Sequence, residues 1–180
     1  MVPEPSNTSK IIHNLSLATW FGGSLFGQIA LNPTVSRISD KNERGRVLNE
    51  AWGRYNAVNL IAIATSLLTW RAGGLKADSE LRAPALARAK DFLLGGAAVN
   101  GIASAVLGAA IASQAPEAAT PVESGTQPAP ETPEEAAWAQ RLVGLTGTSS
   151  LALLAGVIAT STAIETSTVK PRGLLSRLLT

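Results

Sequence analysis

Four long stretches of the chain carry no charged side chain, and charged segments separate them. Residues 11–36, 55–70, 92–116 and 142–164 contain no Asp, Glu, Lys or Arg. A helix rises about 1.5 Å per residue and the hydrocarbon core of a bilayer is about 30 Å thick, so about 20 such residues cross it. A soluble amphipathic helix would carry charges along its exposed face. The pattern therefore predicts an all-α protein, an antiparallel four-helix bundle that is integral to a membrane.

We predict a single membrane domain over residues 1–180, with spans at about 11–34, 52–71, 91–115 and 138–164. The first span meets Pro33, a residue that breaks or kinks helices. The second uncharged stretch is the shortest. However, Trp52 and Trp70 would lie about 27 Å apart along a helix, a spacing typical of two interfacial anchors.

Two segments outside the spans have their own composition. Residues 116–133 are rich in Pro and Glu and lack hydrophobic periodicity, which indicates a solvated, flexible or extended external loop. A capping box from Thr132 to Glu135 then opens the last helix. Residues 170–180 place leucines on one side of a short amphipathic tail. This tail either lies along the bilayer surface or is frayed.

Charge and composition limit the partners. A net charge of +2, with basic residues beside the spans, argues against nucleic acid. The absence of cysteine excludes disulfides, a thiolate metal site and a Cys nucleophile. Placing both termini inside gives nine Lys and Arg on the cytoplasmic side and six outside. We expect a multi-pass protein of the inner (cytoplasmic) membrane with cytoplasmic termini. Its expected partners are the lipid bilayer and other membrane protein subunits or a second copy.

Small residues recur at the spacing used in close helix packing. The predicted packing residues are Gly23 and Gly27 in the first span and Ala97, Gly101, Ser104 and Gly108 in the third. We expect these two spans to make the tightest contact. The alternative is that small residues are simply common in an Ala-rich chain.

Four residues are candidates for ligand binding. His13 and Trp20 are seven residues apart, as are Trp20 and Gly27, so all three share one helix face. A neutral imidazole can bind haem iron, although one histidine supplies only one ligand. The alternative is a histidine hydrogen-bonded to a neighbouring helix. Asn59 and Asn100 lie within spans and should face inward, where they either line a polar cavity or join helices. We predict no metal and no cofactor, with haem at His13 as the alternative.

No catalytic residue is assigned. The spans have no carboxylate at mid-depth, as an ion-coupled transporter typically requires. The sequence also lacks a Ser-His-Asp set, a His cluster and a phosphate-binding glycine loop.

The start of the chain resembles a known type of membrane domain. The first span resembles the opening of CopD-like and related uncharacterised four-helix integral membrane domains. The residues that carry this resemblance are His13, the run from Trp20 to Gly23, Phe26 and the Asn32-Pro33 pair. The stretch 44–55 is similar to their connection into the second helix, and proteins similar to anthrone oxygenase share the outline. The resemblance covers about the first 70 residues and implies a four-helix membrane fold. Copper-handling members would carry further His and Met ligands, whereas this chain has one His and one Met.

Three functions follow as hypotheses. The leading one is a non-catalytic accessory or scaffold subunit of a bacterial membrane complex, packed against other membrane proteins. The second is a membrane binding protein or carrier for haem or a small lipophilic molecule. The third is a membrane enzyme similar to anthrone oxygenase, acting on a lipophilic aromatic substrate.

Overall fold

The computed structural model describes residues 5–167 and is 83% helical, with five helices of eight residues or more. The prediction of a mainly helical protein is confirmed. The α-helices are α1 (Asn7–Phe26), α2 (Asn32–Thr34), α3 (Lys41–Arg71), α4 (Leu75–Arg82), α5 (Pro84–Ala112) and α6 (Glu134–Ser167). The remaining elements are η1 (Gly27–Leu31), a π-helix, the 3-10 turns η2 (Val35–Arg37) and η3 (Pro116–Ala118), and the strands β1 (Val122–Ser124) and β2 (Gln127–Pro128).

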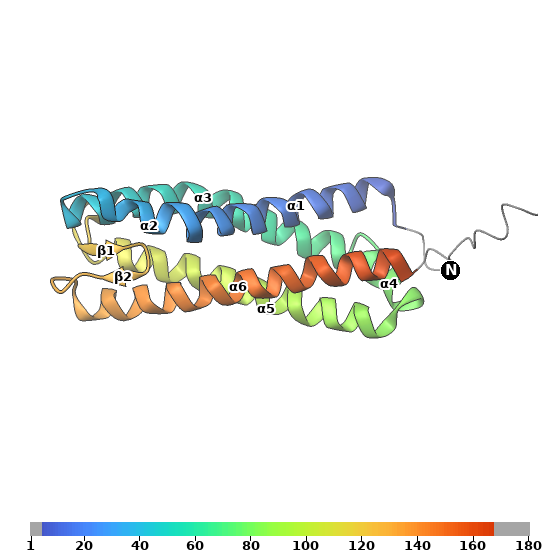
Figure 1. The fold of residues 1–180 in the computed structure, drawn as a ribbon. Helices are drawn as coiled ribbons and strands as arrows, with labels where there is room; N and C mark the ends of the chain where they lie inside the picture. The colour runs from blue at the N-terminus through green and yellow to red at the C-terminus, as the bar shows by residue number, and fades with distance from the viewer. Residues whose placement is uncertain (1–4, 168–180) are drawn as a thin grey trace, which may run out of the picture.

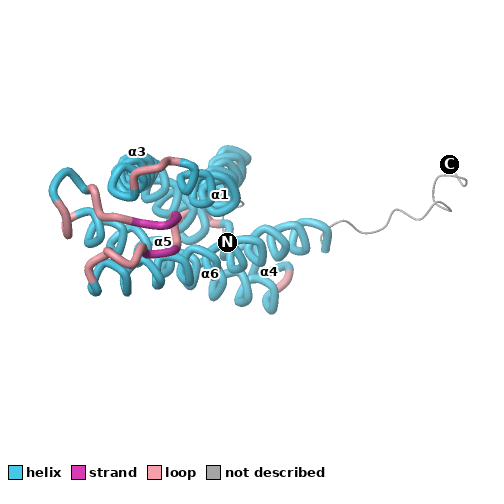
Figure 2. The backbone as a smooth tube through the Cα atoms, turned by 60° about the vertical axis from the view of Figure 1, so that its left-hand side comes forward, coloured by secondary structure: helices cyan, strands magenta, loops and turns pink. Residues whose placement is uncertain are grey.

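Helices α1, α3, α5 and α6 lie side by side and alternate in direction, with α4 at one end and the two strands at the other (Figures 1 and 2). The closest pairs are α1 with α3 and α5 with α6, and contacts of α3 with α5 and of α1 with α6 close the ring. The prediction that the first and third spans make the tightest contact is wrong. The cause is the α3 side chains Tyr55 and Trp52, whose rings occupy the space beside Gly23 and Gly27.

Helix ends follow local sequence signals. The Asp40 carboxylate accepts hydrogen bonds from the backbone N–H groups of Asn42 and Glu43 at 2.8 and 2.9 Å, which caps α3. Gly74 adopts a left-handed conformation between α3 and α4, and Pro84 occupies the first turn of α5. These signals let the chain reverse direction within a few residues.

The first helical run does not stop at Pro33. It widens into the π-turn η1, where the Asn32 N–H donates to the Gly27 carbonyl, and continues through α2 to Arg37. Proline has no N–H, so the bonding pattern of the helix changes around it without ending the helical path.

The core has two separate clusters of buried apolar residues. The larger cluster fills the middle of the bundle and includes Trp20, Leu94 and Leu154, which are fully buried. The smaller cluster, Val35, Leu48 and Val122, lies under the strands. Trp70, predicted as an interfacial anchor, is instead buried in the larger cluster at 1% exposure, where its indole N–H donates to the Asp91 carboxylate at 3.1 Å.

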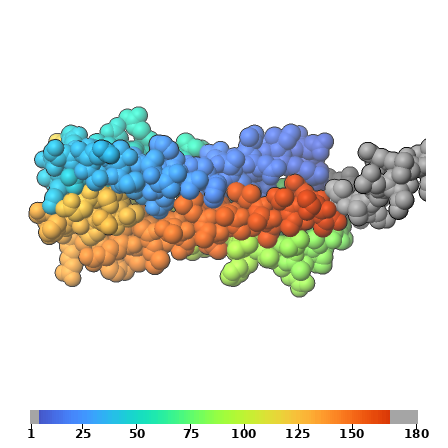
Figure 3. All heavy atoms as spheres, in the orientation of Figure 1, coloured from blue at the N-terminus to red at the C-terminus, as the bar shows by residue number. Residues whose placement is uncertain are grey.

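The connection at 116–133 is folded, which corrects its prediction as a flexible or extended loop. β1 and β2 pair as an antiparallel hairpin, and Thr120 and Val122 are buried. Its atoms lie against the start of α6 and the end of the first helical run (Figure 3). The predicted tail at 170–180 lies outside the described residues.

Two of the helices, α5 and α6, are long and apolar enough to cross a membrane. The pair α3 and α4, bent by 51°, is a third if it is counted as one span. These lengths are compatible with a membrane protein. The predicted first span is not among them, because α1, although 20 residues long, is not apolar enough.

Candidate ligand-binding site

A cavity of about 360 Å³ lies between the two core clusters. All four long helices and the hairpin contribute to its wall, with Trp20 from one cluster and Leu48 and Val122 from the other. The wall combines two tryptophans, several amides and hydroxyls, and many small residues. None of its lining residues is Asp, Glu, Lys, Arg or His.

Four buried polar atoms in this wall have no hydrogen-bond partner. They are the Trp20 indole N–H, the Asn59 and Gln140 amide oxygens and the Ser150 hydroxyl. The four residues are at most 6% exposed. Buried polar groups in proteins are nearly always paired, so four unpaired ones around a single space mark that space as a place for polar partners.

The amide of Gln140 has its orientation set by the hairpin. Its Nε2 donates to the Ser124 carbonyl at 2.8 Å, which leaves Oε1 as the acceptor that faces the cavity. Asn59, on α3, likewise presents an acceptor. Trp20 presents a donor only. The site therefore offers two acceptors, one donor and one hydroxyl that can do either.

Asn32 ties the hairpin to the helices at one end of the cavity. Its side chain accepts a hydrogen bond from the Trp52 indole at 3.0 Å and donates to the Gln28 amide oxygen at 3.2 Å. Its backbone carbonyl accepts the N–H of Gly125, at the hairpin turn, at 2.9 Å. The π-turn η1 ends directly before Asn32. The irregular helix therefore positions the residue that binds the hairpin, which forms a cap over this end of the cavity.

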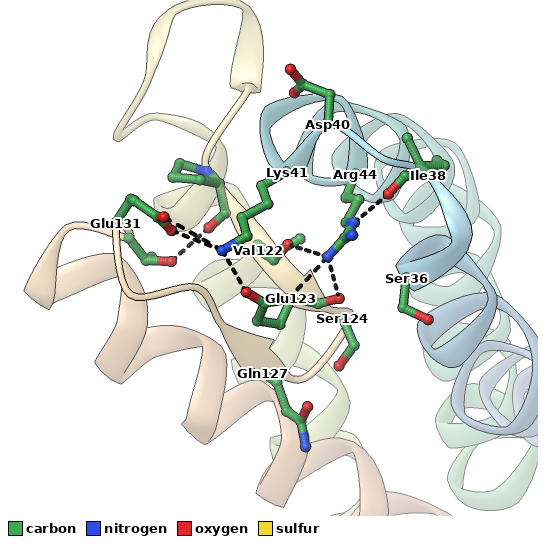
Figure 4. A network of polar contacts seen from close by, with 12 residues as sticks. Ser36, Ile38, Asp40, Lys41, Arg44, Val122, Glu123, Ser124, Gln127 and Glu131 are labelled. Carbon is green, nitrogen blue, oxygen red and sulfur yellow. Dashed lines mark hydrogen bonds and ion pairs between the residues drawn. The ribbon is translucent and has the colours of Figure 1, made fainter.

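Ion pairs hold the hairpin from the other side (Figure 4). Lys41 lies 2.6 Å from Glu123 and 3.2 Å from Glu131, and Arg44 lies 3.0 Å from Glu123. The hydrogen bond from Lys41 lowers the pKa of Glu123, and the same contact raises the pKa of Lys41. The pKa of Glu131 is lowered first by its own backbone N–H and then by Lys41. Most of these groups are partly open to solvent, so their ion pairs position the hairpin more than they stabilise the fold.

The cavity wall is thin between α3 and α5. Leu60 and Gly53 on α3 and Ala109 on α5 line the cavity and are also exposed. A Cβ added at Gly53 or at Gly108 would meet no atom within 4 Å. The cavity therefore reaches the lateral surface of the bundle between these two helices.

The predicted ligand residues separate into two places. Trp20 and Asn59 line the large cavity, whereas Asn100 is half-buried and lines neither cavity. His13 lines a second cavity of about 200 Å³ at the opposite end. Its Nδ1 is bonded to Thr69 at 2.8 Å. His13, Trp20 and Gly27 are all buried.

Haem does not fit the space at His13. Cavities for drug-sized ligands measure roughly 300–1,000 Å³, and this one is smaller. Among residues 5–167, moreover, no group of three or more His, Cys, Asp and Glu side chains is placed to hold a metal ion.

The predicted packing residues contact several different helices. Gly101 leaves room for Ile63 and for the Trp20 ring, and Ala97 is fully buried. Ser104 shares a hydrogen bond with Thr146 of α6 at 2.7 Å. Gly23 and Gly27 contact α3, as described above, and Gly108 faces open space.

Sequence reasoning missed the contribution of α6. Gln140, Val143, Gly147 and Ser150 follow each other at intervals of three and four residues and line the cavity together. The spacing is visible in the sequence, but most residues around these positions are also apolar or small, so the four did not stand out. Gln140 also lies next to Arg141, at the edge of the uncharged stretch, where a polar residue draws no notice.

The chain belongs to a protein family of uncharacterised role. A family model described as a domain of unknown function (DUF4149) matches residues 15–119, more than half of the chain. No curated protein and no solved structure matches it. The prediction of an uncharacterised family is confirmed, and a relationship to CopD-like domains is not shown. The matched region supplies the cavity walls on α1, α3 and α5, while Gln140 and Ser150 lie beyond it.

Proposed function

We propose that the protein binds a small, uncharged, largely apolar molecule in the 360 Å³ cavity. The observation that carries this proposal is the set of four buried, unpaired polar atoms around one space. Leaving a buried polar group unpaired costs about 1–3 kcal/mol. A ligand that supplies hydrogen-bond partners to these groups removes part of that cost, and this gain in free energy favours binding.

The wall indicates the chemistry of the ligand. A charged ligand is disfavoured, since no lining residue can pair with it. The acceptors Asn59 and Gln140 call for hydroxyl or N–H groups on the ligand, and Trp20 calls for an acceptor such as a carbonyl. The volume is at the lower end of that of known ligand sites. A lipophilic molecule bearing one or two hydroxyl or carbonyl groups meets these requirements.

The proposed setting is a membrane, which the four long helices cross. Charged residues gather at the two ends of the bundle, and the uncharged stretches lie between them. Only 22% of the most apolar window of α5, and 17% of that of α6, is buried within the protein. Lipid would cover the rest at no cost. The opening between α3 and α5 would then admit ligand from the bilayer.

The test is a mild-detergent purification of the full chain from its native membrane, followed by solvent extraction and mass spectrometry of the extract. We expect a near-stoichiometric lipophilic molecule that Asn59→Leu removes. Asn100→Leu is the matched control, because it deletes the same amide from a half-buried position outside both cavities. Equal loss from both variants, or an extract with no ligand from the wild type, would overturn the proposal.

An accessory subunit is the second candidate. Its support is a set of exposed small residues on α5, such as Ala89 and Ala110, where another helix could pack closely. The same purified peak tests it, since stoichiometric larger subunits are then expected. The enzyme hypothesis gains no support, because no lining residue of the large cavity supplies an acid or a base.

A further inference from the structure

The second cavity, at the end of the bundle opposite the hairpin, is charged where the first is not. Its volume is about 200 Å³. Its floor is formed by buried residues that include His13, Trp70 and Lys90. Lys10 and Arg82, both exposed, stand at its rim.

Lys90 is a buried cation without an ion pair. The residue is 4% exposed, and its ammonium lies 4.3 Å from the centre of the Trp70 ring. Within residues 5–167 no carboxylate lies within 4 Å of it, and only the charge of Glu165 attracts it from a greater distance. Asp91, the next residue, pairs with Lys76 at 3.0 Å. A buried charge is costly unless it is paired, and a cation–π contact offsets only part of that cost. An anion in the cavity would complete the pairing.

His13 presents an acceptor to the same cavity. The Thr69 hydroxyl donates to the Thr65 carbonyl at 2.7 Å, so it must accept the hydrogen bond that joins it to His13 Nδ1 at 2.8 Å. The proton therefore lies on Nδ1, and Nε2 carries a lone pair. Nε2 is buried and unpaired. It requires a hydroxyl or N–H donor.

The geometry points to an anionic phosphate ester with a neighbouring hydroxyl, such as a phosphoglycerol headgroup, as the ligand of this second cavity. The phosphate oxygens pair with Lys90, and the hydroxyl donates to His13 Nε2. The lipid form of this ligand rests on the proposed membrane setting, in which Lys90 and His13 lie at the ends of uncharged stretches, at the depth of lipid headgroups. Basic pockets between membrane helices bind such headgroups elsewhere.

The other charges that face the cavity permit this assignment. Asp78 is held by Arg82 at 2.9 Å, so this pair is neutral as a whole. Glu165 is exposed and lines the cavity, and its carboxylate attracts the Lys90 ammonium from beyond ion-pair distance. The positive charge that lies deep in the cavity is that of Lys90.

The test titrates the purified full chain in detergent with three short-chain probes by calorimetry. These are dioctanoyl phosphatidylglycerol, phosphatidylmethanol, which has no hydroxyl, and phosphatidylcholine, which has no net charge. We expect binding in that order of affinity. Lys90→Met should weaken phosphatidylglycerol binding about 10- to 100-fold, the usual range for loss of a charged hydrogen bond. His13→Phe should weaken phosphatidylglycerol binding and leave phosphatidylmethanol binding unchanged.

Arg88→Gln is the matched control. It removes one positive charge from the same helix, but it lies outside the cavity. Equal weakening by Arg88→Gln and Lys90→Met, or equal binding of phosphatidylcholine, would overturn the proposal. Free sn-glycerol 3-phosphate serves as a fourth probe. Its binding would identify a soluble phosphate ester as the source, and binding of the lipid alone would identify the headgroup. The result of these titrations does not depend on whether a ligand binds in the large cavity.

Discussion

At the scale of single residues, an unpaired group and a paired one of the same type should respond oppositely to deletion. The Ser150 hydroxyl is buried without a partner, whereas Ser66 shares a 2.8 Å hydrogen bond with Ser16 and lies outside both cavities. We expect Ser150→Ala to leave thermal stability of the ligand-free protein unchanged or raised, and to weaken ligand retention. Ser66→Ala should cost about 1 kcal/mol of stability and leave ligand retention intact. Denaturation midpoints and extracted ligand measure both.

A second prediction at this scale concerns two glycines of the first helical run, Gly22 in α1 and Gly27 at the start of η1. A Cβ at Gly27 would overlap the Trp52 ring, whereas a Cβ at Gly22 would meet nothing within 4 Å. We expect Gly27→Ala to destabilise the protein by about 1–3 kcal/mol through overpacking. Gly22→Ala should be neutral or stabilising by up to about 1 kcal/mol, since alanine favours helix more than glycine does. Equal midpoints for the two variants would contradict this account of the α1–α3 contact.

At the scale of elements, the hairpin should depend on pH. The pKa of Glu123 lies below its ordinary value because Lys41 donates a hydrogen bond to it. The contribution of Glu123 to the stability of the folded hairpin is therefore complete above about pH 4.3, and it is lost as the pH falls through the lowered pKa. The raised pKa of Lys41 keeps that side chain charged through the neutral range. We expect amide-exchange protection of the Gly125 N–H to fall in acid.

Glu123→Gln should lower that protection at neutral pH and abolish most of its acid dependence. Glu135→Gln, in the exposed first turn of α6, is the control and should change neither. Protection that is equally pH-dependent in the Glu123→Gln variant would assign the effect to other groups.

The same element shows where sequence reasoning succeeds and where it stops. Uncharged runs are local signals, and they located the long helices. The helix starts at Asp40 and Pro84 also follow from local sequence. The hairpin depends on contacts such as Lys41 with Glu123, which are 82 positions apart, and no local pattern records them. Trp20 and Asn59 were found because polar or aromatic residues stand out in apolar runs. The sequence does not show which helices lie next to each other. It therefore could not show that Trp20 and Asn59 line one cavity, or that α6 residues line it with them.

At the scale of the whole molecule, the two cavities give the bundle two different ends. One end holds an uncharged chamber under a folded cap, and the other holds a charged pocket around Lys90. A bilayer placed across the uncharged stretches would put the hairpin on one side and the start of α1, with the end of α6, on the other (Figure 1). The two ends would thus meet different aqueous compartments.

That arrangement is testable because the chain has no cysteine of its own. Single variants Ser6→Cys and Thr126→Cys mark the start of α1 and the hairpin turn. In intact cells, a membrane-impermeant maleimide should label Thr126→Cys at once and Ser6→Cys only after permeabilisation, as expected for cytoplasmic termini. The opposite pattern would reverse the orientation and keep the membrane crossing. Labelling of both sites in intact cells would require an even number of crossings between them. It would therefore contradict the proposed bundle, in which α1, α3 and α5 separate the two positions by three passes.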